Sequence, residues 1–377
     1  MKASGFCFEV TARDGAARSG RLATPHGVVE TPAFMCVATY GAVRGVSMPV
    51  LEGLGAQILL ANTYHLHERP GEDTIAGLGG LHGFSGFGGP WLTDSGGYQV
   101  TSLADRMQLD EDGITFSSPL DGTRRSLTPE SAIAIQEKLG ADIAMVLDVC
   151  HRPRPDAKES ESRRMREAME QTLRWARRSA AARSRPDQAV FGIVQGGLSA
   201  ELRRTSAAGT VDVGFDGYAH GGLGLGEPRS QRGELIEAAQ AALPEERPRY
   251  LMGLGHPIDL VDAVAAGVDL FDCVVPTRNG RHGVLFTSRG RLQAKSARFR
   301  DDPLPPDPDC DCATCSRVSR GYLRHLLSIG ESLGAQLASV HNLRFTLRLL
   351  ERARAAIAAG TFAALRREVA ALEDARV

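Results

Sequence analysis

The sequence predicts an α/β fold, and in particular a (β/α)8 TIM barrel, on three observations. Eight apolar segments have the length of strands and are bounded by turn residues. Helical patterns with recognisable ends lie between several of them. Some of the clearest runs also stop at a polar side chain, at Asp94, Asp148, Gln195 and Asp272. Because the carboxyl ends of barrel strands face the active-site mouth, we expect these four side chains to share one pocket.

The predicted strands are short apolar runs, as buried parallel strands require. In chain order they cover residues 33–38, 57–61, 91–94, 143–148, 190–194, 218–222, 250–253 and 269–272. Two helices between them have clear ends. Thr128 is an N-cap followed by Pro129, with Gly140 past the end, and the pattern over 257–266 is closed by Gly267. This repeated alternation favours a barrel over a doubly wound sheet.

The segments outside the barrel have different signatures. The first 30 residues, with FCFEV and a glycine-rich turn region, predict a β-hairpin that precedes the barrel. The proline-rich stretch 301–309 cannot continue a helix and marks a linker, and helical patterns follow over 318–329 and from about 340 onward. We therefore expect the barrel and its extension over 1–302, a small subdomain over 303–350 and a C-terminal helix over 351–377 that packs on the barrel.

Composition narrows the function class. The chain has 377 residues, 42% of them apolar, and carries neither a signal peptide pattern nor an apolar run long enough to span a membrane, so a cytoplasmic location is expected. The net charge of -1 argues against an indiscriminate polyanion binder. Residues 278–300, however, hold seven Lys or Arg and no acid, directly after Asp272. A block of this kind beside a carboxylate favours a phosphate-rich substrate over a plain solvated face.

Three of the seven cysteines are clustered, at Cys310, Cys312 and Cys315. This spacing favours a metal site over a disulfide framework, and a tetrahedral zinc needs a fourth ligand. His325 falls mid-helix and is more simply a surface residue, whereas His341 is expected at a helix start with its ring facing the cluster. Three thiolates and one imidazole leave no open position, so the predicted cofactor is one structural Zn²⁺.

The polar strand ends indicate glycosyl transfer to or from a purine. Asp94 and Asp272 form the carboxylate pair that such chemistry uses, one at the anomeric carbon and one at the proton. Asp148 and Gln195 suit the polar edge of a purine, together with a backbone N–H at the Gly221–Gly222 pair. Tyr98 and Met252 are candidates to sandwich the ring, although Met252 also suits a core position.

Taken together and in this order, these segments resemble the bacterial tRNA-guanine transglycosylases, also called queuine tRNA-ribosyltransferases. The resemblance runs through LLANTYHL, WLTDSGGYQV, PLDGT, GIVQGG, FDGYAHGGLGLGE, YLMGLGHPIDL, FDCVVPTRNGRHG and the DCDCATC cluster with SVHN. It covers nearly the whole chain.

The resemblance implies an enzyme that exchanges guanine at the wobble position of GUN-anticodon tRNAs (the Asp, Asn, His and Tyr acceptors) for a 7-deazaguanine base. It implies that Asp272 attacks the ribose C1′ and that Asp94 is the general acid and base, with the anomeric configuration retained. A homodimer is also implied. The implied base-binding residues are Asp94, Ser95, Gly96, Gly97, Tyr98, Asp148, Cys150, Gln195, Gly221, Gly222, Leu223 and Met252. The implied RNA contacts are Gly253, Leu254, Gly255, His256, Pro257, Ile258, Asp259, Thr277, Arg278, Asn279, Gly280 and Arg281.

Two residues bear in opposite directions on the choice between the bases preQ1 and queuine. Val149 stands where bacterial members usually have glutamate and is more like the eukaryotic enzymes, which use queuine. Leu225 is bulky where eukaryotic members carry glycine, which favours the smaller preQ1. His220 stands where an apolar residue is usual, and beside the pocket it is expected to make binding depend on pH near neutrality.

Two other function classes fit parts of the pattern. A glycoside hydrolase would use the same carboxylate pair, but sugar sites usually carry aromatic platforms and this chain has only two Trp. A non-catalytic RNA-binding subunit would not need both Asp94 and Asp272. Release of reducing sugar, or tRNA binding without base exchange, would distinguish these classes.

Overall fold

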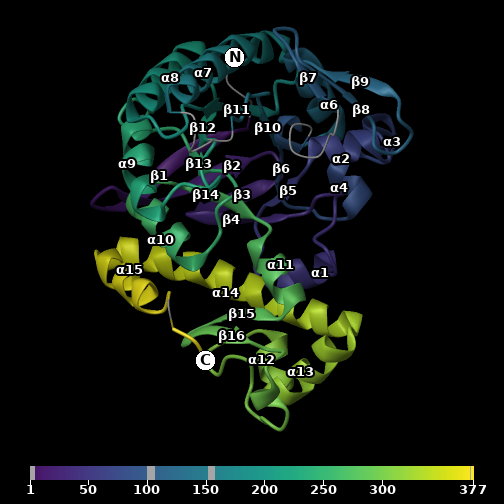
Figure 1. Cartoon of the computed structure of the whole chain (residues 1–377), viewed down its shortest axis with the longest axis vertical. Coiled ribbons are helices and arrows are strands. Elements are labelled where there is room, and N and C mark those ends of the chain that lie inside the picture. The colour runs from purple at the N-terminus through teal and green to yellow at the C-terminus, as the bar shows by residue number, and fades with distance from the viewer. Residues whose placement is uncertain (1–4, 100–106, 152–157, 374) are drawn as a thin grey trace.

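The computed structural model describes residues 5–99, 107–151, 158–373 and 375–377. It consists of a closed barrel with helices around it and a smaller unit below, and one long helix runs between the two (Figure 1).

The central barrel is confirmed as eight parallel strands in the closed order β10-β11-β12-β13-β14-β4-β5-β6. Residues of these strands are almost all buried, which explains why the sequence shows apolar runs rather than alternation. The bounds of the strands are β4 Ala33–Val37, β5 Leu59–Ala61, β6 Trp91–Thr93, β10 Ile143–Met145, β11 Ala189–Val194, β12 Gly217–His220, β13 Arg249–Leu251 and β14 Leu270–Cys273.

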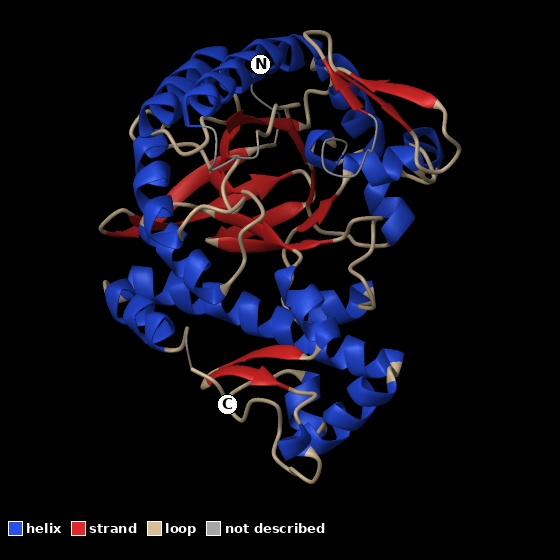
Figure 2. Ribbon diagram, in the orientation of Figure 1, coloured by secondary structure: helices blue, strands red, loops and turns tan. Residues whose placement is uncertain are grey.

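Helices cover the outside of the barrel (Figure 2). The predicted ends of one are confirmed: Thr128 accepts a hydrogen bond from the Ser131 amide and Gly140 closes the helix in the left-handed conformation. The helices of the barrel region are α1 Met48–Gly53, α2 Thr63–Glu68, α3 Glu72–Gly77, α4 Gly80–Ser85, α6 Pro129–Leu139, α7 Lys158–Ala182, α8 Ala200–Val213, α9 Arg229–Gln240, α10 Pro257–Ala265 and α11 Val275–His282.

The predicted N-terminal hairpin is present as part of a larger sheet. Strands β1 (Cys7–Asp14), β2 (Ala17–Thr24) and β3 (Gly27–Thr31) form a three-stranded antiparallel sheet. The sheet is fastened to the barrel by Arg18, whose guanidinium donates two hydrogen bonds to the carboxylate of Asp269, at 2.9 and 2.5 Å. Both side chains are fully buried.

A second antiparallel sheet interrupts the barrel sequence between β6 and β10. It contains β7 (Met107–Leu109), β8 (Ile114–Ser117) and β9 (Arg124–Leu127). The sequence pattern did not predict this sheet. Its strands are short and partly exposed, so neither unbroken apolar runs nor long alternation marks them.

The smaller unit has its own apolar core, which includes Leu285, Leu292, Leu323 and Leu327. The β15–β16 hairpin belongs to that core although it precedes residue 303, the predicted start of the subdomain. The elements of this unit are β15 Val284–Thr287, β16 Gly290–Gln293, η1 Ala297–Phe299, α12 Ala313–Arg317 and α13 Arg320–Ile329.

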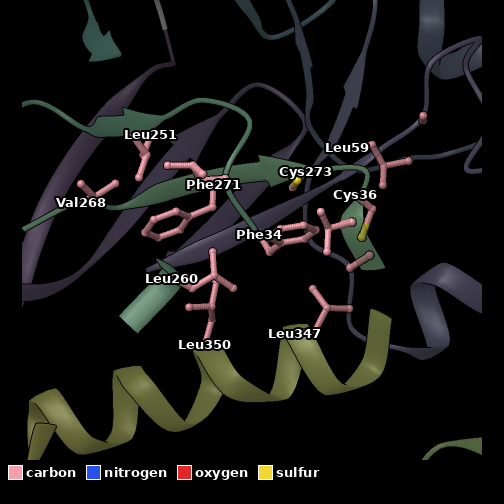
Figure 3. Packing of buried hydrophobic residues seen from close by; sticks show 14 of the residues in the cluster. Phe34, Cys36, Leu59, Leu251, Leu260, Val268, Phe271, Cys273, Leu347 and Leu350 are labelled. Carbon is pink, nitrogen blue, oxygen red and sulfur yellow. The ribbon is translucent and has the colours of Figure 1, made fainter. Parts of the chain in front are cut away.

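Helix α14, Ser332–Ala358, joins the two units. Its side chains Leu347 and Leu350 point toward Phe34, Leu260 and Phe271 of the barrel (Figure 3). The helix begins earlier than the sequence predicted, and it passes without a break through residue 350, the predicted boundary. Beyond it, α15 (Phe362–Ala371) contacts α10.

Within the described part of the chain, no helix combines the length and the apolar character that crossing a lipid bilayer requires.

Candidate active site and metal cluster

A cavity of about 660 Å³ opens at the carboxyl ends of the barrel strands. It brings together all four polar side chains that end the predicted strands. The predicted residues that line it are Asp94, Ser95, Tyr98, Asp148, Cys150, Gln195, Gly221, Gly222, Leu223, Met252, Gly253, Leu254, Gly255, His256, Asp259, Asp272 and Arg278.

The other predicted contacts lie behind the cavity wall or along two helices. The Gly96 amide donates to Asp94, and a side chain at Gly97 would meet Leu147, so both glycines shape the turn after β6. The remaining predicted residues, in the first turn of α10 and on α11, are Pro257, Ile258, Thr277, Asn279, Gly280 and Arg281.

Asp94 is held at the end of β6 by several donors. Its Oδ2 accepts hydrogen bonds from the side-chain amides of Asn62 at 2.5 Å and Gln99 at 2.6 Å, and its Oδ1 accepts one from the Thr63 amide at 2.9 Å. These bonds favour the charged carboxylate, but burial is stronger and raises the pKa of Asp94 to about 6. The nearby charge of Asp272 raises it further. Asp94 can therefore both give and take a proton near neutral pH.

Asp272 lies on β14 with one oxygen anchored. Its Oδ1 accepts hydrogen bonds from the Tyr250 hydroxyl at 2.6 Å and from the Gly253 amide at 2.8 Å. Among the described residues, no donor binds Oδ2. Burial raises the pKa of Asp272, while these two hydrogen bonds lower it. The arrangement fixes the carboxylate and leaves one oxygen to act on a substrate.

A third carboxylate faces the same cavity from the segment after β10. Asp148 accepts a hydrogen bond from the Gln195 side-chain amide at 2.6 Å, and burial raises the pKa of Asp148 to about 6. Gln195 lies so close to the next strand end that a Cβ on Gly221 or Gly222 would come within 2.6 Å of its amide group. Glycine is thus required where this polar wall forms.

Four residues that shape the site were not assigned from the sequence. Asn62 and Tyr250 bind the carboxylates of Asp94 and Asp272. Asn62 follows β5 directly, so the strand-end argument could have found it, whereas Tyr250 lies inside a strand. The fully buried Arg203 donates from α8 to the carbonyls of Gly197 and Gly221, at 2.8 and 3.1 Å.

The fourth residue, Glu227, accepts hydrogen bonds from the amides of Gly224 at 2.6 Å and Leu225 at 3.0 Å. Because the peptide between Leu223 and Gly224 is planar and trans, its carbonyl points away from Glu227. Nothing in the local sequence distinguishes this glutamate from a surface residue.

The expectation for His220 is wrong. Its side chain is fully buried and is not among the residues that line the cavity. Burial, together with the charges of Arg203 and Arg249, lowers the pKa of His220 to about 3. The imidazole therefore stays neutral throughout the range near pH 7.

The predicted metal ligands do meet. The ligand atoms of Cys310, Cys312, Cys315 and His341 all lie within 4.8 Å of one another. His341 Nε2 donates to the Phe286 carbonyl at 2.7 Å, which leaves Nδ1 free to face Cys315 Sγ at 3.2 Å. His341 lies well inside α14 rather than at a helix start, and His325 is an exposed residue of α13 outside the cluster. Three thiols and one imidazole form a possible metal-binding site.

The basic block is divided between two places. Arg278 and Arg281 lie on α11, and Arg278 lines the cavity. Arg291 lies on β16 of the smaller unit, where it pairs with Glu373 at 2.8 Å. Only the first part of the block therefore flanks the site.

The fold and the site define a class of protein: a (β/α)8 barrel enzyme with a carboxylate pair in one cavity, suited to glycosyl transfer, and a separate possible metal-binding site. The family model described as queuine tRNA-ribosyltransferase matches residues 14–374. The chain belongs to this family, whose members are transferases that act on tRNA.

Three relatives show how close the likeness is, and each is a queuine tRNA-ribosyltransferase. A protein from Thermus thermophilus is 53% identical over 365 residues, which cover 97% of this chain and 94% of the relative. The one from Herpetosiphon aurantiacus is 50% identical over 352 residues, with coverage of 93% and 88%. The one from Xanthomonas campestris is 50% identical over 371 residues, with coverage of 98% and 96%.

Proposed function

We propose that this enzyme exchanges guanine at the wobble position of GUN-anticodon tRNAs for a 7-deazaguanine base through a covalent tRNA intermediate. The observation that carries the proposal is that Asp94, Asp148 and Asp272 line one cavity. Two of these carboxylates are placed for bond exchange at a ribose, and the third belongs to a wall suited to a purine. The family and its relatives support tRNA as the substrate.

In the first step, the carboxylate of Asp272 attacks the ribose C1′. The bond from C1′ to the guanine nitrogen breaks, and its electron pair leaves with guanine, which takes a proton from Asp94. In the second step, Asp94 removes a proton from the incoming base, whose nitrogen attacks C1′ and releases Asp272. Two displacements at one carbon retain its configuration. The pKa of about 6 suits Asp94 to both proton transfers.

Base recognition is assigned to the polar wall. The Asp148 carboxylate accepts from the N–H groups of the purine edge, and Gln195 and the Gly222 amide serve its carbonyl. The Leu223 carbonyl, turned away from Glu227, can accept from an amine on the 7-substituent. Tyr98 and Met252 lie at the cavity for stacking. The carbonyl would accept equally from the amine of preQ1 or of queuine, so the preference for preQ1 rests on the bulk of Leu225.

Base competition tests the proposal directly. Unmodified tRNA is labelled with radioactive guanine, and guanine, preQ1 or queuine is then supplied with the enzyme. We expect preQ1 to displace the label, and queuine to do so far more slowly. Release of label by none of the bases would refute the exchange activity, while efficient release by queuine alone would refute only the preferred base.

Base binding is expected to weaken in acid. A protonated Asp148 loses an acceptor, and its pKa lies at about 6, so the KM for guanine should rise about tenfold per pH unit below pH 6. Acid unfolding driven by the titration of Asp94 and Asp148 cannot cause this rise in KM. Their pKa values are raised on folding, so their contribution to stability is present at low pH and is lost as pH rises through about 6. Steady-state kinetics from pH 5 to 8 would check it, and a flat KM for guanine would contradict the role of Asp148.

We propose that Cys310, Cys312, Cys315 and His341 hold one structural Zn²⁺. A bound zinc would fix the smaller unit against α14 and has no open position for catalysis. The cluster also lies outside the lining of the cavity.

Removal of the metal is expected to lower the stability of the protein, because the metal takes no part in the reaction itself. A Cys315→Ser variant should contain less than one zinc per chain and should melt at a lower temperature, because metal binding and folding are coupled. Elemental analysis and thermal melting measure both effects. Cys7→Ser is the matched control, since Cys7 is exposed and outside the cluster. Full zinc content in the Cys315→Ser variant would exclude Cys315 as a ligand.

The remaining assignments rest on the family resemblance. We propose the Asp, Asn, His and Tyr acceptors as the tRNA substrates, a homodimer as the working form and the cytoplasm as its location. Sedimentation of the enzyme with and without tRNA would test the dimer.

A further inference from the structure

The loop between β4 and α1 carries two exposed side chains that the proposed mechanism does not use, Tyr40 and Arg44. Two successive turns build the loop: the Gly41 amide donates to the Ala38 carbonyl at 2.8 Å, and the Val46 amide donates to the Val43 carbonyl at 3.0 Å. Val43 and Val46 are buried, whereas Tyr40 is 56% exposed and Arg44 is also exposed. The packing therefore fixes the loop and leaves these two side chains at the turn tips.

Tyr40 lies beside the mouth of the cavity. Its ring packs on that of His65, with centroids 4.9 Å apart and planes inclined by 49°. His65 lines the cavity, and so does Thr39, the residue that precedes Tyr40 in the chain. Burial lowers the pKa of His65, so its ring is neutral near pH 7. An exposed aromatic face supported by a second ring is the kind of platform on which an unpaired nucleobase stacks.

Arg44 is one of three neighbouring arginines, with Arg278 and Arg281, that have no acidic partner among the described residues. Burial lowers the pKa of Arg281, and the positive charges of Arg44 and Arg278 lower it further, so the three groups lie close enough to repel one another. Among the described residues, none of the three forms an ion pair. Arg278 lines the cavity, which places this cation group at its mouth. A ligand with closely spaced negative charges would relieve the repulsion.

We infer that the loop after β4 binds a nucleotide next to the exchanged one, with Tyr40 stacking on its base and Arg44 completing a phosphate site with Arg278 and Arg281. This inference rests on the proposed function and extends the RNA contacts to a segment outside those implied by the resemblance. The combination favours single-stranded RNA, because a protein partner rich in acids would use the cations but not the aromatic platform.

The test compares Tyr40→Ala with Tyr40→Phe, and Arg44→Ala with Arg44→Lys, on unmodified tRNA. We expect Tyr40→Ala to raise the KM for tRNA about tenfold, and Phe to restore it, because stacking needs only the ring. Arg44→Ala should raise the same KM and should lower the slope of log affinity against log salt by about one, while Lys keeps that slope. The KM for guanine should not change. Arg21→Ala, at an exposed arginine on β2, controls for loss of surface charge.

Three outcomes would overturn the inference. A KM for tRNA within about twofold of wild type in both alanine variants would exclude an RNA contact at the loop. An equal rise in the KM for guanine would show a general disturbance of the cavity. A change in sedimentation of Arg44→Ala, with the salt slope unaltered, would assign the arginine to a contact between two copies of the chain. Absence of exchange by the wild-type enzyme would instead refute the proposed function.

Discussion

Replacing Asp272 with asparagine is expected to lower base exchange by a factor on the order of 10⁴ or more. An amide of the same shape keeps the contacts of one oxygen with Tyr250 and Gly253 but cannot attack the ribose C1′. The measurement is incorporation of labelled guanine into tRNA, with a denaturing gel for the covalent adduct between enzyme and tRNA. Both signals should disappear in the variant.

Tyr250→Phe is the matched comparison for this experiment. It removes one donor to Oδ1 while the Gly253 amide and the carboxylate remain, so the adduct should still form, at a rate reduced by about tenfold. Exchange by Asp272→Asn at the wild-type rate would show that another group is the nucleophile. Loss of the adduct in Tyr250→Phe with unchanged folding would show that the tyrosine itself is essential.

Arg18→Met is expected to reduce the free energy of unfolding by about 3–5 kcal/mol. The substitution leaves the carboxylate of Asp269 buried without its charged partner, and it removes donors to the carbonyls of Glu245 and Arg247. Denaturant unfolding followed by circular dichroism would measure the loss. Arg21→Met is the control, because the pair of Arg21 with Glu30 is exposed and such pairs contribute about 0–1 kcal/mol.

A double variant separates the loss of stability caused by the unpaired buried charge from the loss caused by changed packing. If the unpaired carboxylate causes the loss, Arg18→Met combined with Asp269→Leu should recover part of the stability, since replacing both partners removes the buried charge. Equal effects of Arg18→Met and Arg21→Met would mean that the buried pair does not hold the N-terminal sheet on the barrel.

The barrel and the core of the site could be predicted from the sequence because both depend on local signals. A parallel strand buried on both faces must be apolar, and the residue that follows it reaches the mouth, so the order of residues alone was enough to group Asp94, Asp148 and Gln195. The close spacing of the three clustered cysteines is also a local signal, and it predicted their place in one cluster. The structure confirms the barrel and the grouping of these side chains in one cavity.

What could not be predicted depends on contacts between distant segments. The pKa of His220 is lowered first by burial and then by the charges of Arg203 and Arg249 from other elements, so its local sequence led to the wrong expectation of a titrating group. Glu227 acts through backbone amides in its own loop, a geometry that residue type does not reveal. The start of α14 was placed too late, although Leu333, Leu337 and Val340 already recur at helical spacing between its small and polar residues.

Helix α14 has a consequence for how the molecule denatures. One 27-residue helix provides His341 to the Cys/His cluster at one point, and Leu347 and Leu350 to the barrel at another. Because both units pack on this one helix, unfolding of α14 would remove support from both, so heat is expected to melt them in a single cooperative transition. A shortened chain that ends at residue 302 would expose the apolar side of Phe34 and Phe271, and it is expected to aggregate rather than to form an independent barrel.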